Sequence, residues 1–247
     1  MSRQRIHFLV EGNAEQNLVE RILAPHLALL GLDCFAQRFR TRRDLRRGQV
    51  FKGGGTNYAK PRKDLERMIA QWRNHPDTWL STSFDLYEIP SDFPGYAAAI
   101  TEPDLWRKVE ILEGALAQDV ASMGCQRFIP HVMVHEFESL LFTNIRALST
   151  LLLGKEKEIA QVHQAVAHFQ SPEHINTQKG PSGWIIEKLP LYEKYKGKEL
   201  NGAINVLEVI GLPAIRQVCA HFSAWVGRIE KLATQPRPTA GSAGSAA

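Results

Sequence analysis

The sequence predicts an α/β protein, in which a mostly parallel sheet is flanked by helices and followed by a C-terminal helical extension. Over residues 1–150, short apolar segments alternate with longer segments of helical spacing, which is the pattern of parallel βαβ units. Over residues 151–233 only helical segments follow. Residues 234–247 are rich in Pro, Gly, Ser and Ala, and we expect them to be a disordered tail or a linker.

Four segments of the first part have strand character, because they are short, apolar and bounded by turn residues. These expected strands are residues 6–10, 35–40, 79–87 and 127–135, and the third loses its strand character at Asp85. The expected helices are residues 13–30, 60–73, 104–123 and 136–148. Pro25 should kink the first helix or divide it into two short helices before Gly31, because proline cannot donate the backbone hydrogen bond that a helix interior needs.

Helical spacing continues in the extension over residues 156–169, 184–189 and 200–210. The last helix has the clearest pattern. It begins with Pro213 in its first turn and carries apolar residues in steps of three and four as far as Leu232. We expect this helix to be unbroken and to pack into the core.

The composition excludes several classes of protein. With 247 residues, 44% of them hydrophobic and 23% charged, the chain can bury a core without metal or disulfide support. Cys34, Cys125 and Cys219 are far apart, which argues against a disulfide framework or a cysteine zinc site and favours a reducing cytoplasm. No apolar run approaches the ~20 residues of a spanning helix, so we expect no membrane association. The oligomeric state is left open, and a homo-oligomer is compatible with the sequence.

Positive charge is concentrated in one segment, although the net charge is only +4. Arginine is well suited to bidentate contacts with phosphate, so this segment favours contact with nucleic acid. The alternative is a solvated loop whose arginines pair with acids elsewhere in the fold. The expected nucleic-acid-binding residues are Arg38, Arg40, Arg42, Arg43, Arg46, Arg47 and Lys52, together with Lys60 further along the chain.

Acidic residues follow three of the expected strands. The carboxyl ends of parallel strands meet at one edge of a sheet, so these acids should converge, and crowded carboxylates usually hold a divalent cation. Oxygen donors without sulfur favour Mg²⁺ or Mn²⁺, which support phosphoryl transfer. The expected metal ligands are Glu11, Glu15, Asp85, Glu88 and Asp92, and the expected catalytic residues are Glu11, Asp85 and Glu136.

Two of these acids have simpler explanations. Glu15 is also suited to the first turn of a helix, where the helix dipole favours an acid, and Glu136 can play the same part at a later helix. His131 and His135 with Glu136 resemble a zinc site only superficially, because zincin spacing requires the glutamate between two histidines of one helix. His221, on the last helix, is expected to be a hydrogen-bonded packing residue.

The segment Phe8-Leu9-Val10-Glu11-Gly12 resembles the first motif of Toprim domains, which topoisomerases, primases and OLD-family nucleases share. Glu15 matches the Glu-x-x-x-Glu form of the OLD-type nucleases, and Asp85 lies where their Asp-x-Asp motif begins. The second aspartate of that motif is replaced by Tyr87. The resemblance implies a Toprim-like, Rossmann-like sheet that binds one or two metal ions.

Over residues 4–232 the sequence also resembles a bacterial family of domains of unknown function. The segments that carry it are Asp85-Leu86-Tyr87, Asp92-Phe93-Pro94-Gly95, His135-Glu136-Phe137-Glu138-Ser139-Leu140-Leu141-Phe142, Ile175-Asn176, Pro181-Ser182, Ile210-Gly211-Leu212 and Cys219-x-His221-Phe222. Members of that family are often encoded beside ABC-type ATPases in apparent phage-defence loci. The resemblance therefore implies a metal-dependent endonuclease, a hydrolase of DNA or RNA, that works in antiviral defence with an ATPase partner. The alternative is a non-catalytic interaction or sensor subunit of an ATPase complex.

Overall fold

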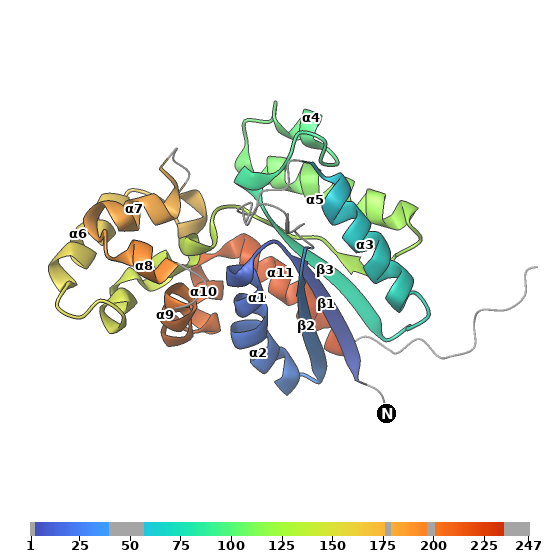
Figure 1. The fold of residues 1–247 in the computed structure, drawn as a ribbon, viewed down its shortest axis with the longest axis horizontal. Coiled ribbons are helices and arrows are strands. Elements are labelled where there is room, and N and C mark those ends of the chain that lie inside the picture. Colours follow the sequence, from blue (N-terminus) through green and yellow to red (C-terminus); the bar gives the residue numbers. More distant parts are fainter. Residues whose placement is uncertain (1–2, 40–56, 176–178, 197–200, 235–247) are drawn as a thin grey trace, which may run out of the picture.

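The computed structural model describes residues 3–39, 57–175, 179–196 and 201–234. Figure 1 shows a sheet at the centre, helices on both of its faces, and a lobe of helices beside one end of the sheet. The strands point their carboxyl ends toward the region between this lobe and helices α4 (Tyr96–Ala99) and α5 (Leu105–Ser122). Loops that leave the strands there are placed to form a site.

The sheet is parallel throughout its described part. Its strands are β1 (Gln4–Val10), β2 (Leu32–Arg38), β3 (Thr78–Asp85), β4 (Phe128–Ile129) and β5 (Val132–Met133). The order is β2-β1-β3-β4, and β5 pairs with the end of β3. The predicted α/β class with a mostly parallel sheet flanked by helices is confirmed.

Helices from different parts of the chain cover the two faces of the sheet. Leu9, Leu80 and Phe84 pack with apolar residues of α5 and of α3 (Ala59–Trp72) on one face. The alternate residues Ile6, Phe8 and Val10 of β1 face the other side, where the extension packs. That second face is covered by α1 (Asn13–Asn17), a π-helical segment (Leu18–Leu23), α2 (Ala24–Leu29) and the C-terminal helices. A short 3-10 helix, Leu86–Glu88, follows β3.

Prolines change two of the predicted elements. Pro25 lies in the first turn of α2, directly after the π-helical segment, where its missing N–H interrupts fewer helical bonds. The predicted strand 127–135 is divided at Pro130 into β4 and β5. The helix predicted over 136–148 is a 3-10 helix, Phe137–Thr150, with a kink at Asn144.

The extension consists of helices, as predicted. They are α6 (Glu156–Val166), a 3-10 turn (Pro172–His174), α7 (Gly180–Lys188), α8 (Tyr192–Lys196), α9 (Gly202–Ile210), α10 (Leu212–Val218), α11 (Ala220–Glu230) and a final 3-10 turn (Lys231–Thr234). Their apolar side chains share one core cluster with β1, α2 and the 3-10 helix Phe137–Thr150. Within the described residues, no helix has the length and apolar character that crossing a bilayer requires.

The prediction of one unbroken C-terminal helix is wrong. The chain leaves helical geometry at Cys219, which has φ −106° and ψ 88°, and α11 begins after it. The buried Glu173 side chain accepts hydrogen bonds from the backbone N–H groups of His221 and Phe222, at 3.1 and 2.9 Å. A carboxylate at this position satisfies first-turn donors and stabilises a new helix start. Glu173 is distant in sequence, so the apolar pattern of residues 213–232 did not reveal the break.

Helix α11 is anchored to the sheet through Trp225, which is fully buried. Its Nε1–H donates to Ser81 Oγ at 3.1 Å, and the Ser81 hydroxyl donates to the carbonyl of Ile129 at 2.7 Å. Its ring also contacts Phe8 edge to face, with centroids 5.7 Å apart. This anchor fixes the extension to the central strands.

Replacing Trp225 with alanine should lower the free energy of unfolding by about 3–5 kcal/mol, because the change removes a buried ring and leaves a cavity. Trp184 is half-buried and lies under Lys179, so Trp184→Ala should cost less than about 1 kcal/mol. Urea unfolding followed by circular dichroism measures both. Equal losses in the two variants would contradict the anchoring role of Trp225.

Candidate functional site

Parallel pairing brings Glu11 and Asp85 together. Strand β1 pairs with β3 so that Val10 lies opposite Ser83, and the two acids follow at the carboxyl ends of these neighbouring strands. The backbone of Asp85 also forms a hydrogen bond with the Glu11 carboxylate. Both acids are partly buried, so neither is fully solvated.

Glu15 turns back toward the end of β1. Its Oε2 accepts a hydrogen bond from the backbone N–H of Gly12 at 2.9 Å. A Cβ atom at position 12 would lie 2.9 Å from the same oxygen, so a larger residue there would displace the end of the Glu15 side chain. Glu15 therefore does serve in the first turn of α1, as the simpler explanation proposed, and its charge still reaches Glu11 and Asp85.

The two strand-end acids have raised pKa values. Burial raises the pKa of Glu11 to about 8, and the charges of Asp85, Glu15 and Glu88 add to this effect. Burial likewise raises the pKa of Asp85 to about 7; the N–H of Tyr87, 2.9 Å from its Oδ1, opposes the shift, and the charges of Glu136, Glu15 and Glu88 increase it. The site thus brings several negative charges together. None of the main influences on these two pKa values comes from a positively charged side chain.

This donor set fits a hard divalent cation, because every expected ligand is a carboxylate, and burial together with neighbouring acids disfavours ionisation of Glu11 and Asp85 unless positive charge is added. Within the described residues, three or more ligating atoms lie within 4.8 Å of one another only in Glu113, His131 and His221. The strand-end carboxylates would therefore have to draw together around an ion.

Glu136 connects the site to the extension. It directly precedes the 3-10 helix Phe137–Thr150, and its Oε2 accepts the backbone N–H of Ser182 at 2.9 Å, in the first turn of α7. The chain passes so close at Gly180, where φ is +66°, that a Cβ atom there would lie 2.9 Å from Glu136 Oε1. Glu136 is therefore held by α7 while its charge acts on Asp85.

Glu88 and Asp92 lie in the segment after β3, but they differ in position. Glu88 is exposed, and its charge raises the pKa of both Glu11 and Asp85. Asp92 instead accepts the backbone N–H of Tyr58 at 2.8 Å, which ties its loop to the start of α3. Its charge is not among the main ones that act on Glu11 or Asp85. The structure thus gives Asp92 a structural role and leaves its predicted role as a ligand without support.

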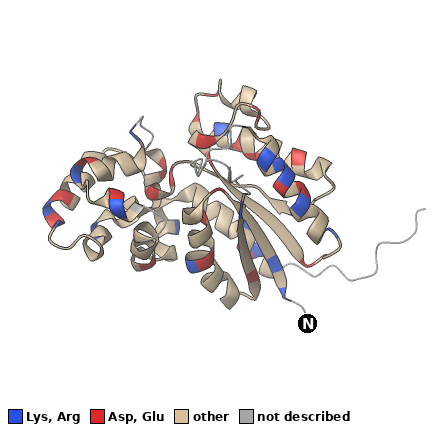
Figure 2. Ribbon diagram, in the orientation of Figure 1, with Lys and Arg blue, Asp and Glu red and all other residues tan. Residues whose placement is uncertain are grey.

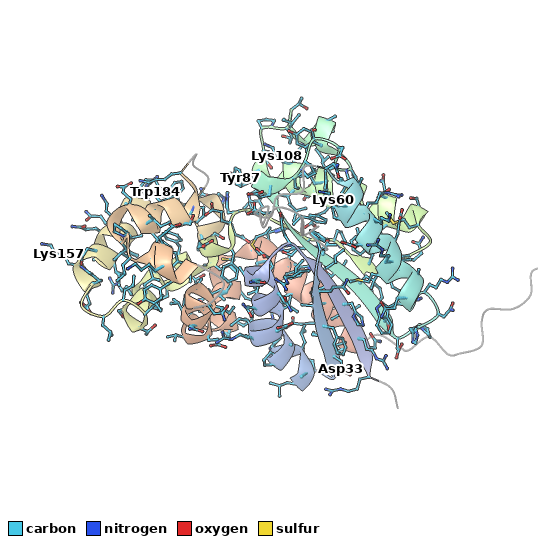
Figure 3. The ribbon with its side chains drawn as sticks, viewed as in Figure 1. Asp33, Lys60, Tyr87, Lys108, Lys157 and Trp184 are labelled. Carbon is cyan, nitrogen blue, oxygen red and sulfur yellow. The ribbon has the colours of Figure 1, made fainter. Side chains whose placement is uncertain are left out.

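Two of the predicted nucleic-acid-binding residues lie in the described part of the chain. Arg38 ends β2 opposite Val10, and its guanidinium donates to Asn13 Oδ1 beside the candidate site. Lys60 is exposed in the first turn of α3, which begins at the same end of the sheet (Figures 2 and 3). The others, Arg40, Arg42, Arg43, Arg46, Arg47 and Lys52, lie outside the described residues.

The aromatic side chain of Tyr87 lies beside the candidate site, and the sequence did not predict a role for it there. Tyr87 is 55% exposed and stacks on His135, with ring centroids 5.5 Å apart and an interplanar angle of 24°. The His135 ring is fixed in turn, because its Nε2 donates to the carbonyl of Glu173 at 2.7 Å. Figure 3 shows Tyr87 between the helical lobe and the α4–α5 part of the core. The Toprim resemblance identified this position only as a missing acid.

A pocket of about 220 Å³ adjoins Glu15 between α1 and α9. Asn13, Asn17 and Tyr195 contribute to its walls, together with Asn201, whose Oδ1 accepts from Asn17 Nδ2 at 2.9 Å. The extension therefore forms part of the surroundings of the candidate site. Because α9 is distant from α1 in sequence, residue patterns alone could not identify this pocket.

A second group of side chains, Glu113, His131 and His221, can hold a metal ion. It lies on α5, the β4–β5 connection and α11. Sequence reasoning expected a packing role for His221 and did not single out Glu113. A glutamate on the face of a long helix gives no local signal of ligation.

The pKa of Glu11 leads to a prediction about pH. The folded protein has a Glu11 pKa of about 8 against an ordinary value of 4.5, so between these values the folded state retains a proton that the unfolded state has released. The Glu11 side chain should therefore destabilise the metal-free protein increasingly as the pH rises through this window. Relative to the wild-type protein, Glu11→Gln should gain stability on the order of 2 kcal/mol near pH 8. The comparison is made between the two proteins because His7, His131 and His135, whose pKa values burial lowers to about 4, change stability in the opposite direction.

Urea unfolding in EDTA between about pH 5 and pH 8 measures this effect. Glu20→Gln is the control, because Glu20 is an exposed acid that contacts Gln16. If Glu11→Gln gains no stability relative to the wild-type protein between the two ends of the window, the assigned environment of Glu11 is wrong.

Comparison with known proteins gives one family. The family model described as a domain of unknown function, DUF4276, matches residues 10–230. No curated protein and no solved structure matches the chain. The matched region begins at Val10, the last residue of β1. It includes Glu11, Asp85, Glu136 and α11. The chain therefore belongs to the DUF4276 family.

Proposed function

We propose that this chain is a divalent-metal-dependent nuclease that hydrolyses phosphodiester bonds of DNA or RNA. The observation that carries the proposal is the convergence of Glu11 and Asp85, with Glu15, Glu88 and Glu136 near enough to change their pKa values. A divalent cation would replace the protons that compensate these carboxylates in the metal-free protein. The site lies beyond the carboxyl ends of parallel strands, which is where open α/β sheets commonly bind their ligands.

Mg²⁺ or Mn²⁺ suits the site better than Zn²⁺, because the donors are carboxylate oxygens. When bound, such an ion neutralises charge on the phosphate and lowers the pKa of a coordinated water. Glu11 and Asp85 would hold it, and Glu15 is oriented toward them by the N–H of Gly12. Glu136, fixed by the N–H of Ser182, is placed to position a water or to complete the ligand set.

Arg38 supports nucleic acid as the substrate. Its guanidinium lies beside Asn13 at the rim of the site, where it can bind the phosphate next to the one that reacts. More arginines follow Arg38 in the sequence, and their charge would favour binding of a polyanion. A polyanion would then be held by basic residues while the carboxylates hold the ion.

A role in antiviral defence with an ABC-type ATPase partner, in the cytoplasm, is part of the proposal. It is supported by the resemblance of the His135–Phe142 segment and its companions to a family encoded beside such ATPases. The helical lobe offers the partner a surface apart from the sheet edge that carries the acids. The ATPase would then control a nuclease that is harmful when unregulated.

A second function, a non-catalytic sensor subunit of an ATPase complex, is favoured by Tyr87. This exposed ring stands where the resemblance expects a second acid. A vestigial site of this kind would bind nucleic acid and no Mg²⁺ or Mn²⁺. Isothermal titration of Mn²⁺ separates the two functions, because the nuclease requires saturable binding that Asp85→Asn removes.

Cleavage should depend on the strand-end acids and not on Asp92. With Mn²⁺ or Mg²⁺, Glu11→Gln and Asp85→Asn should each lower the rate at least about 100-fold, because each removes a charge that holds the ion. Asp92→Asn should cleave at close to the wild-type rate, since the amide oxygen can still accept from Tyr58. The assay follows nicking of plasmid DNA and cutting of labelled RNA. Wild-type activity in both strand-end variants would reject the assigned site.

Arg38→Ala should weaken binding of nucleic acid in a way that does not depend on its sequence. Loss of one phosphate contact should reduce the slope of log K against log salt by about 1. Arg3→Ala is a matched control, because Arg3 lies at the amino end of β1, away from the site, and contacts Ala28 and Asp33. Fluorescence anisotropy at several salt concentrations measures the slopes. An unchanged slope in Arg38→Ala would remove Arg38 from the interface.

A further inference from the structure

Glu113, His131 and His221 converge on one point although they lie on three elements. Glu113 Oε1 is 3.5 Å from His131 Nδ1 and 3.1 Å from His221 Nε2. The three ligating atoms lie within 4.8 Å of one another. A tetrahedral cation with bonds of about 2.0–2.2 Å separates its ligands by about 3.4 Å. The spacing from the carboxylate to each imidazole is therefore that of a metal site.

His131 is buried without the partners that a packing histidine would have. Its side chain is 1% exposed, and neither of its ring nitrogens has a hydrogen-bond partner. His221 Nδ1 is also buried and unpartnered. A buried polar atom without a partner costs about 1–3 kcal/mol, so such atoms usually have a ligand or another specific role. Here Nδ1 of His131 faces the carboxylate with which it would share a cation.

The neighbours of these three side chains hold them in place. The N–H of Val132 donates to Glu113 Oε1 at 3.0 Å, and the Arg228 guanidinium lies 3.3 Å from Oε2. Arg228 therefore occupies one carboxylate oxygen and leaves the other facing both imidazoles. The His131 ring stacks on Trp225, with centroids 4.1 Å apart and an interplanar angle of 7°. Outer contacts of this kind orient ligands before the metal binds.

Glu113 and His131 are also in the ionisation states that a metal requires. Burial lowers the pKa of His131 to about 4, so its imidazole is neutral at pH 7. Burial opposes ionisation of Glu113, but its contacts with His131 and His221 outweigh this effect and hold its pKa well below the ordinary value. Metal binding at neutral pH therefore has little proton competition at these two groups.

We propose that Glu113, His131 and His221 form a second metal site that binds Zn²⁺, with the fourth position taken by water. Two imidazoles and one carboxylate favour Zn²⁺ over Mg²⁺, which prefers oxygen donors. The bound ion links α5, the β4–β5 connection and α11, and so it stabilises the attachment of the extension to the sheet. This site does not depend on the nuclease function, because it shares no ligand with the strand-end acids.

Zn²⁺ and Co²⁺ binding to the full chain test the site. The apo protein should bind one equivalent of Zn²⁺, its melting temperature should rise, and Co²⁺ should give the visible absorption of a tetrahedral ion with nitrogen ligands. In Glu113→Gln and His221→Asn, Zn²⁺ affinity should fall at least about 100-fold and the Co²⁺ spectrum should be lost. His221 is less buried than His131, so a substitution of His221 should disturb folding less than a substitution of His131.

His174→Gln is the matched control, because His174 contacts Trp106 near His221 and binds Ser171 instead of Glu113. It should retain the affinity and the spectrum. The proposal would be overturned if the wild-type protein showed no saturable Zn²⁺ binding. It would also be overturned if Glu113→Gln and His221→Asn bound Zn²⁺ as tightly as the wild-type protein does. Mn²⁺-dependent cleavage by His221→Asn reports separately on the nuclease, so the two proposals can fail independently.

Discussion

Parallel pairing of β1 with β3 forces Glu11 and Asp85 into one partly buried space. The backbone of both acids is held in place, because Glu11 directly follows β1, Asp85 ends β3, and the apolar residues of both strands are fixed in the core. Burial of these carboxyl groups raises the pKa of both, and the negative charges of the neighbouring acids add to the effect. Protons or a cation must compensate them. This electrostatic requirement connects the topology of the sheet to the proposed chemistry.

The extension takes part in this arrangement. Its helix α7 binds Glu136 through the N–H of Ser182, and α9 closes the pocket beside Glu15. Its last helix carries Trp225 and His221 against the sheet, next to Glu113. Displacement of the extension would therefore change the surroundings of both candidate metal sites. An ATPase partner that contacts the helical lobe would have a direct route to the acids.

Much of the fold and the centre of the site could be predicted from the sequence. Apolar segments of strand length ended close to the observed strands, and the rule that parallel strands end at one edge predicted that Glu11 and Asp85 would meet. What could not be predicted depends on contacts between distant segments. Glu173 creates the break at Cys219, and Tyr58 engages Asp92 in a structural bond. Local residue patterns carry no information about either partner.

The histidine site shows the same limit. Glu113 occupies a helix face, His131 a connection between strands and His221 a helix start, so their convergence follows only from the packing of α11 on the sheet. The Toprim resemblance pointed to the strand-end acids, and no local motif pointed to the histidines. Geometry was needed to group them.

A crystal grown with Mn²⁺, with anomalous data collected at the manganese edge, tests the central claim most directly. The account predicts a peak between the carboxylates of Glu11 and Asp85, with oxygen ligands at manganese distances and at least one of Glu15, Glu88 or Glu136 beside it. Saturating Mn²⁺ with no peak at these two residues, or with density only at Glu113 and the histidines, would contradict it.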